Sequence, residues 1–182
     1  MTIEDSRYVT VALIVSLVLN VLLGATVLRL KNTGPKAPSV PSRLPEGALL
    51  VPFSAEDSAG RQIVVHPADG MSTTVLYFLS PECSWCQRNL ESVRALAAMS
   101  GSKYRMIGIS LSPQRTPDTA KQYPFPVYFN PEPGLASSYG LSGTPQTMIV
   151  SSDGRVLKNL PGLYVGAVRT EIMRTLGVVL PD

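Results

Sequence analysis

The chain has 182 residues, a formal net charge of +3 and 45% hydrophobic residues, so it can form one ordinary domain and an additional segment. Residues 47–182 carry eleven Lys and Arg residues against ten Asp and Glu residues. A domain so close to neutral gives no sign of a nucleic-acid partner, and we expect none.

The first predicted element is a transmembrane anchor within residues 1–31. No charged residue occurs from Tyr8 to Leu28, and a helix needs about 20 predominantly apolar residues to cross a bilayer. A cleaved signal peptide is the alternative, but its apolar region is usually only about 7–15 residues long. Residues 23–25 (Leu-Gly-Ala) also match a cleavage site poorly, so an uncleaved anchor is the preferred interpretation.

Residues 32–46 are predicted to be a Pro-rich linker between this anchor and a domain over residues 47–182. Four prolines with small and polar residues between them cannot hold a helix, so the segment reads as a semi-extended spacer. Three basic residues follow the apolar run, whereas the single basic residue before it is offset by two acidic ones. Taken alone, this charge distribution weakly favours a cytoplasmic domain.

The domain is predicted to alternate between strands and helices. Two strands, 48–55 and 61–66, flank a turn at 56–60 that is typical of a β-hairpin. This order predicts an α/β fold whose mixed sheet is flanked by helices. The elements expected after the hairpin are strand 73–79, helix 84–99, strand 104–111, helix 113–123, strand 126–129, helical segment 134–139, strands 146–151 and 156–160, and helix 164–176.

Strand 73–79 is a short apolar run, which predicts a strand buried on both faces. The only two cysteines, Cys83 and Cys86, form a Cys-x-x-Cys motif where this strand leads into helix 84–99. Haem attachment requires a His directly after the second Cys, where this chain has Gln87. A structural zinc site requires four N or S ligands, and the chain offers two Cys and one His. We therefore expect no cofactor and no metal site, and a redox dithiol fits without additional ligands.

The position of the motif predicts different roles for its two sulfur atoms. Cys83 is expected at the N-terminus of the helix, where unpaired N–H groups and the helix dipole stabilise a thiolate. Cys86 follows three residues later on the same helical face and can attack a mixed disulfide formed on Cys83. Cys83 is thus the predicted nucleophile and Cys86 the predicted resolving thiol.

A Gly-Thr-Pro sequence at 143–145, directly before a strand, completes a second motif. With it the chain resembles the thioredoxin superfamily over roughly residues 47–177. The hairpin and the anchor make it similar to the membrane-anchored TlpA/ResA type. The Ser80-Pro81 pair before the motif, together with the anchor, makes it similar to the methylamine-utilisation thioredoxin-like proteins. This resemblance implies a thioredoxin-like fold, a thiol–disulfide oxidoreductase, a cis bond before Pro145, and substrate contacts by Trp85, Thr144 and Pro145.

The same resemblance implies a setting for the enzyme. The domain is expected outside the cytoplasm, on the periplasmic side of the cell membrane. We give this resemblance more weight than the charge distribution, which weakly favours a cytoplasmic domain. Its substrates are expected to be protein dithiols and disulfides, for example in the maturation of cytochrome c or another redox enzyme, with electrons from a membrane thiol donor.

Two other functions are weighed against this interpretation. A metallochaperone or assembly factor that holds Cu(I) on the dithiol is the alternative from a different class, because soft thiolates favour that ion. A peroxiredoxin is disfavoured, because the Pro-x-x-x-Thr-x-x-Cys arrangement is absent around Cys83.

At two positions the chain departs from the proteins that it resembles. Thioredoxins carry a buried Asp in the strand before the motif, where this chain has Tyr77. Many ResA-type reductases carry a Glu in the following helix, where this chain has Asn89. In those proteins, both acids are proposed to transfer protons to and from the buried thiol of the second cysteine, which corresponds to Cys86. The sequence therefore assigns no proton acceptor to Cys86.

Overall fold

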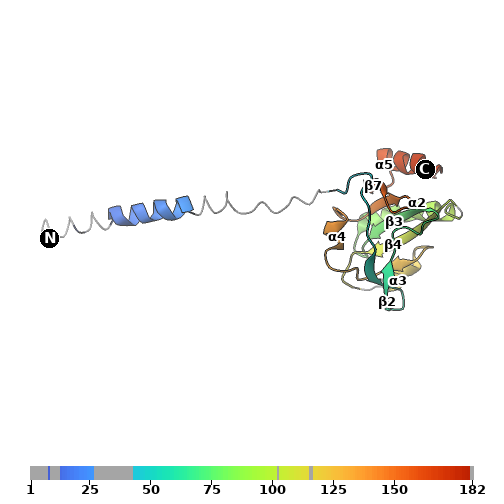
Figure 1. Cartoon of the computed structure of the whole chain (residues 1–182), viewed down its shortest axis with the longest axis horizontal. Helices are drawn as coiled ribbons and strands as arrows, with labels where there is room; N and C mark the ends of the chain where they lie inside the picture. The colour runs from blue at the N-terminus through green and yellow to red at the C-terminus, as the bar shows by residue number, and fades with distance from the viewer. Residues whose placement is uncertain (1–7, 9–12, 27–42, 102, 115–116, 181–182) are drawn as a thin grey trace. The chain divides into compact units, whose positions relative to one another are not determined.

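The computed structural model describes residues 8, 13–26, 43–101, 103–114 and 117–180. The chain divides into two compact units, Met1–Ser39 and Val40–Asp182, and each is described by itself. In the first unit, residues 13–26 are helical (blue in Figure 1). No helix within the described residues is long and apolar enough to cross a membrane. Residues 1–7, 9–12 and 27–31 of the predicted anchor and residues 32–42 of the predicted linker lie outside the described residues.

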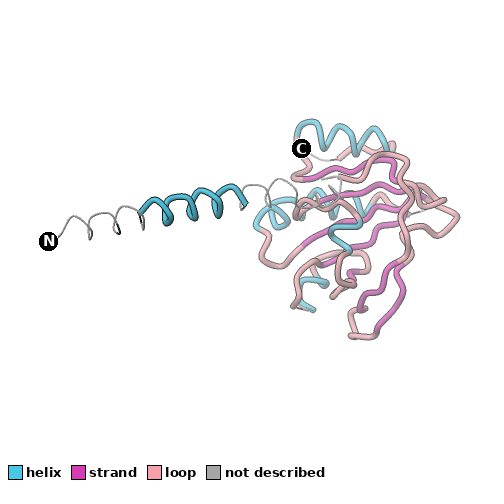
Figure 2. The backbone as a smooth tube through the Cα atoms, turned by 60° about the vertical axis from the view of Figure 1, so that its left-hand side comes forward, coloured by secondary structure: helices cyan, strands magenta, loops and turns pink. Residues whose placement is uncertain are grey.

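The second unit is built on a five-stranded mixed sheet with the strand order β5-β4-β3-β6-β7. Figure 2 shows the strands of this unit in magenta and the helices that flank them in cyan. The central strand β3 (Thr73–Leu79) runs parallel to β4 (Tyr104–Ser110) and antiparallel to β6 (Gln146–Val150). The predicted α/β class and the predicted order of elements are both confirmed. The other elements after the hairpin are α2 (Ser84–Ala98), α3 (Pro117–Lys121), β5 (Val127–Tyr128), α4 (Leu135–Ser138), β7 (Val156–Pro161) and α5 (Gly166–Leu176).

Strand β3 separates two hydrophobic clusters, because successive side chains of a strand point to opposite faces of the sheet. Val75, Tyr77 and Leu79 pack with residues of α2 and α5 on one face. Leu76 and Phe78 pack with the N-terminal hairpin and α4 on the other face. Six of the seven residues of β3 are buried, as its uninterrupted apolar sequence predicts for a strand covered on both sides.

The predicted hairpin forms a separate two-stranded antiparallel sheet of β1 (Phe53–Glu56) and β2 (Gln62–Val65). The Asp57 carboxylate closes its turn by accepting two backbone N–H hydrogen bonds, each of 2.9 Å. The first strand begins later than predicted, because the preceding residues pair elsewhere. The backbone N–H of Leu50 donates to the carbonyl oxygen of Gly154 at 2.9 Å, in the turn between β6 and β7.

Two helices begin two or more residues later than predicted, and each late start has a local cause. Helix α3 begins at Pro117 instead of residue 113, since proline lacks an N–H and therefore suits the first turn of a helix but not its interior. Helix α5 begins at Gly166 instead of Tyr164, because Val165 has the extended backbone of an N-cap residue, with φ −127° and ψ 156°.

Candidate active site

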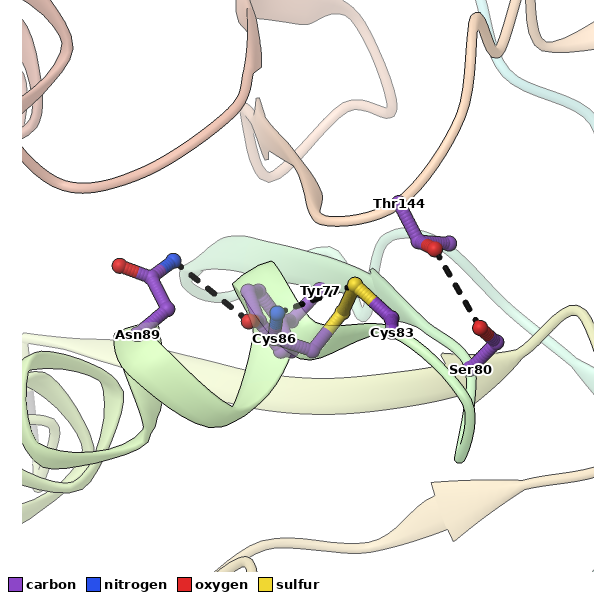
Figure 3. Close-up of a disulfide and its surroundings, with 6 residues drawn as sticks. All are labelled: Tyr77, Ser80, Cys83, Cys86, Asn89 and Thr144. Atoms are coloured by element: carbon purple, nitrogen blue, oxygen red, sulfur yellow. Dashed lines mark hydrogen bonds between the residues drawn. A yellow bond between two sulfur atoms is a disulfide. The ribbon is translucent and has the colours of Figure 1, made fainter.

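The Cys83–Cys86 disulfide lies where β3 leads into α2 (Figure 3). Cys83 is the N-cap of α2, with φ −78° and ψ 101°, and its Sγ accepts the backbone N–H of Cys86 at 3.0 Å. The two Cα atoms are 5.2 Å apart. Cys86 is fully buried, whereas Cys83 is partly exposed. A partner protein can therefore reach the sulfur of Cys83 but not that of Cys86.

The N-terminus of α2 determines the electrostatic environment of Cys83. The first N–H groups of a helix lack intrahelical partners and form its positive end. The first turn of α2 contains no acidic residue that would cancel this field. In the reduced protein the field favours the Cys83 thiolate, which is the nucleophilic form of the side chain. The exposed carboxylate of Glu82 opposes it, but solvent and salt screen that charge.

The loop before β6 faces the disulfide. Its Thr144–Pro145 peptide bond is cis, as predicted. The hydroxyl oxygens of Ser80 and Thr144 lie 3.4 Å apart and join this loop to the segment after β3 (Figure 3). Trp85 is 53% exposed, and it lines one hollow together with Thr144 and Pro145. The structure thus brings together all the residues that the sequence predicts for the site, while their roles stay predictions.

Two buried amide side chains, those of Gln146 and Asn159, stabilise this loop from the side of the sheet. The side-chain oxygen of Gln146 accepts the backbone N–H of Ser142 at 2.9 Å. Its Nε2 donates to Oδ1 of Asn159 on β7 at 2.6 Å. Gln146 is fully buried, so its amide has few alternative partners. Sequence reasoning missed this pair, because nothing in the local pattern distinguishes a buried amide from an exposed one.

A network of neutral polar side chains lies next to Cys86. It includes Tyr77 on β3 and Asn89 on α2, the two positions where the sequence lacks an acid. Asn89 Nδ2 donates to the hydroxyl of Tyr77 across 3.5 Å, a long contact. Asn89 Oδ1 accepts the backbone N–H of Tyr164 at 2.9 Å. The Tyr164 hydroxyl lies 2.9 Å from that of Thr147 on β6. All four side chains are at most 2% exposed. The sequence pointed to Tyr77 and Asn89 but not to Tyr164 and Thr147.

Burial keeps the phenols of this network protonated. Desolvation is the main cause that raises the pKa of Tyr77 and of Tyr164 above the ordinary value of tyrosine. Neither phenol therefore carries a charge near neutral pH. The two positions where the resembling proteins carry an acid, Tyr77 and Asn89, are therefore hydrogen-bonded but uncharged in this chain.

The described residues contain no cluster of three or more His, Cys, Asp and Glu side chains that could hold a metal ion. His66, the only histidine of the chain, is exposed after β2.

Comparison with known families identifies the domain. The model of the AhpC/TSA family matches residues 47–159, which is more than half of the chain. The chain belongs to the AhpC/TSA family. A search of the curated proteins finds no significant match. The family match covers the hairpin, the Cys-x-x-Cys motif and the loop at Thr144 that faces it.

Solved structures share the fold. A putative thiol:disulfide interchange protein DsbE from Chlorobium tepidum is 23% identical, with a TM-score of 0.60 over 74% of this chain and 99% of that chain. StoA from Bacillus subtilis is 17% identical, with a TM-score of 0.52 over 69% of this chain and 96% of that chain. Family and fold together confirm a thioredoxin-like enzyme of the thiol–disulfide oxidoreductase class.

Proposed function

We propose that the chain is a membrane-anchored thiol–disulfide oxidoreductase that reduces protein disulfides outside the cytoplasm. The observation that carries this proposal is the asymmetry of the cysteine pair. Cys83 is partly exposed at the N-terminus of α2, whereas Cys86 is fully buried behind it. The exposed sulfur faces the loop of Thr144, where a substrate chain can lie.

The reaction follows from this asymmetry and is balanced in electrons. The Cys83 thiolate attacks one sulfur of a substrate disulfide, so a mixed disulfide forms and the other substrate sulfur leaves as a thiolate. Cys86 then loses its proton and attacks Cys83, which releases the second substrate thiolate. Two electrons have passed to the substrate, its two thiolates take up protons, and the protein holds the Cys83–Cys86 disulfide.

Another turnover requires a two-electron reductant, which we assign to a dithiol donor in the same membrane. The apolar run from Tyr8 to Leu28 supports the anchor, and the Pro-rich segment 32–46 supports a spacer between membrane and domain. Substrates in cytochrome c maturation, or in the maturation of another redox enzyme, accord with this arrangement. The basic residues after the apolar run argue weakly for the opposite orientation.

The equilibrium potential of the Cys83–Cys86 pair tests the direction of electron flow. We expect a potential below about −200 mV, in the range of dithiols that reduce protein disulfides. Titration against glutathione or dithiothreitol, followed by gel shift after alkylation, measures it. A potential well above that value would assign the chain to the oxidants or isomerases and overturn the reducing role.

Labelling of whole cells tests the orientation of the domain. After mild reduction, a membrane-impermeant maleimide should modify Cys83 in intact cells, because this sulfur is partly exposed. The Cys83→Ser variant is the matched control and should remain unlabelled, since Cys86 is buried. Modification that appears only after the cells are permeabilised would place the domain in the cytoplasm.

A further inference from the structure

Three neighbouring hollows share lining residues, and together they are here called the active-site groove. The first hollow, at Trp85, and the second, at Glu82, both contact Gly143 and Thr144. The second and third hollows share residues 111–113, and the third ends at the loop before α4. The loop that faces Cys83 therefore has one hollow on the side of Trp85 and another on the side of Glu82.

The backbone at the centre of this groove is available to a bound chain. Within the described part of the protein, neither Gly143 nor Thr144 makes a backbone–backbone hydrogen bond. Exposed N–H and C=O groups of this kind can pair with an extended peptide, and side-chain pockets then provide selectivity. Selectivity must consequently come from the side chains that line the groove on either side.

In the described part of the chain, the charged side chains that line the groove are all negative. Among the described residues that line the three hollows, Glu82 and Glu132 are the only charged ones. The Glu132 carboxylate already accepts the backbone N–H of Ser54 at 3.1 Å. Glu82 is exposed, directly precedes Cys83, and forms no ion pair with another described residue. Its negative charge is thus free to act on a substrate next to the reactive sulfur.

We propose that Glu82 selects substrate segments that carry Lys or Arg within about three residues of the cysteine that is attacked. An extended chain advances about 3.3 Å per residue, so a long basic side chain at such a position can reach Glu82. The inference rests on the proposed function and adds a substrate class to it. The attraction acts between exposed charges, so its effect is a modest one that depends on salt.

Cyclic disulfide peptides provide the test. Three peptides of identical sequence carry Lys, Gln or Glu two residues from one cysteine, and the full chain is purified in mild detergent and fully reduced. Stopped-flow measurement of tryptophan fluorescence, with alkylation and mass analysis of the products, gives the single-turnover rate of each peptide. At low salt we expect the Lys peptide to react about two- to tenfold faster than the Glu peptide. The ratio should fall toward one in about 0.5 M salt.

Glu82 variants separate selectivity from reactivity. Glu82→Gln should bring the ratio close to one, and Glu82→Lys should invert it, whatever happens to the absolute rates. The ratio is the informative quantity, because the same Cys83 sulfur attacks every peptide. Glu91→Gln removes an exposed charge from α2 outside the groove, and it should keep the parental ratio.

Two results would contradict the inference in different ways. Equal rates for all peptides, or an unchanged ratio in Glu82→Lys, would overturn the role of Glu82 and leave the proposed function intact. Failure of the parent chain to react with any of the peptides would overturn the proposed function, and the role of Glu82 with it.

Discussion

Replacing Cys83 with serine is expected to abolish disulfide reduction, with a loss of more than about a thousandfold. A serine hydroxyl stays protonated at neutral pH and cannot form the mixed disulfide from which the second step begins. The buried Cys86 cannot substitute for it, because a protein substrate does not reach its sulfur. The measurement is single-turnover reduction of a disulfide-bonded substrate protein by the pre-reduced chain.

Cys86→Ser is the matched variant, because it removes the second sulfur and keeps the first. It should form the mixed disulfide at Cys83 and stop there, so that the substrate stays covalently bound and can be identified by mass spectrometry. Parental turnover by Cys83→Ser would disprove the assigned nucleophile. Tight stoichiometric Cu(I) binding by the reduced parent chain without any disulfide exchange would instead support a metallochaperone.

Replacing Asn89 with alanine is expected to lower the free energy of unfolding by about 2–4 kcal/mol. The change leaves the buried backbone N–H of Tyr164 without its acceptor and removes the donor that faces the Tyr77 hydroxyl. Urea denaturation followed by circular dichroism measures the loss. Gln87→Ala changes an exposed position on the same helix and should alter stability by less than about 0.5 kcal/mol. Equal effects of the two variants would argue against the network.

Asn89→Asp should make stability depend on pH. An aspartate can accept the N–H of Tyr164 and the O–H of Tyr77, but burial disfavours its charged form and raises its pKa above about 3.9, the unfolded value. The protonated Asp side chain therefore makes its full contribution to the free energy of unfolding below about pH 4. This contribution is lost as the pH rises toward the pKa of the side chain in the folded protein. The loss amounts to about 1.4 kcal/mol per pH unit in that interval.

Unfolding free energies at pH 4, 6 and 8, each compared with the parent chain, measure this dependence. The same variant also places a proton acceptor one helical turn from Cys86. A difference from the parent chain that stays constant with pH would mean that the new carboxylate reaches solvent, so the space around Asn89 would not be closed as the structure shows.

Local patterns in the sequence predicted most of the fold. The apolar run of β3 required a strand buried on both faces, and the spacing of Val93 and Leu96 matched the buried face of α2. The motif at Cys83 and the Thr144–Pro145 pair could be read because each depends on a few neighbouring residues. The predicted starts of α3 and α5 were too early, since Pro117 suits only the first turn of a helix and Val165 has an extended backbone.

The thioredoxin-like order of elements and the position of the two cysteines at the start of a helix could both be predicted from the sequence, because each depends on local patterns. Only the folded structure shows which side chains surround the buried Cys86. The Asn89–Tyr164 contact joins residues 75 positions apart, and no local periodicity carries such information. Whether a polar side chain is buried depends on which distant backbone group it meets, so the neutral network beside Cys86 emerged only from the folded chain.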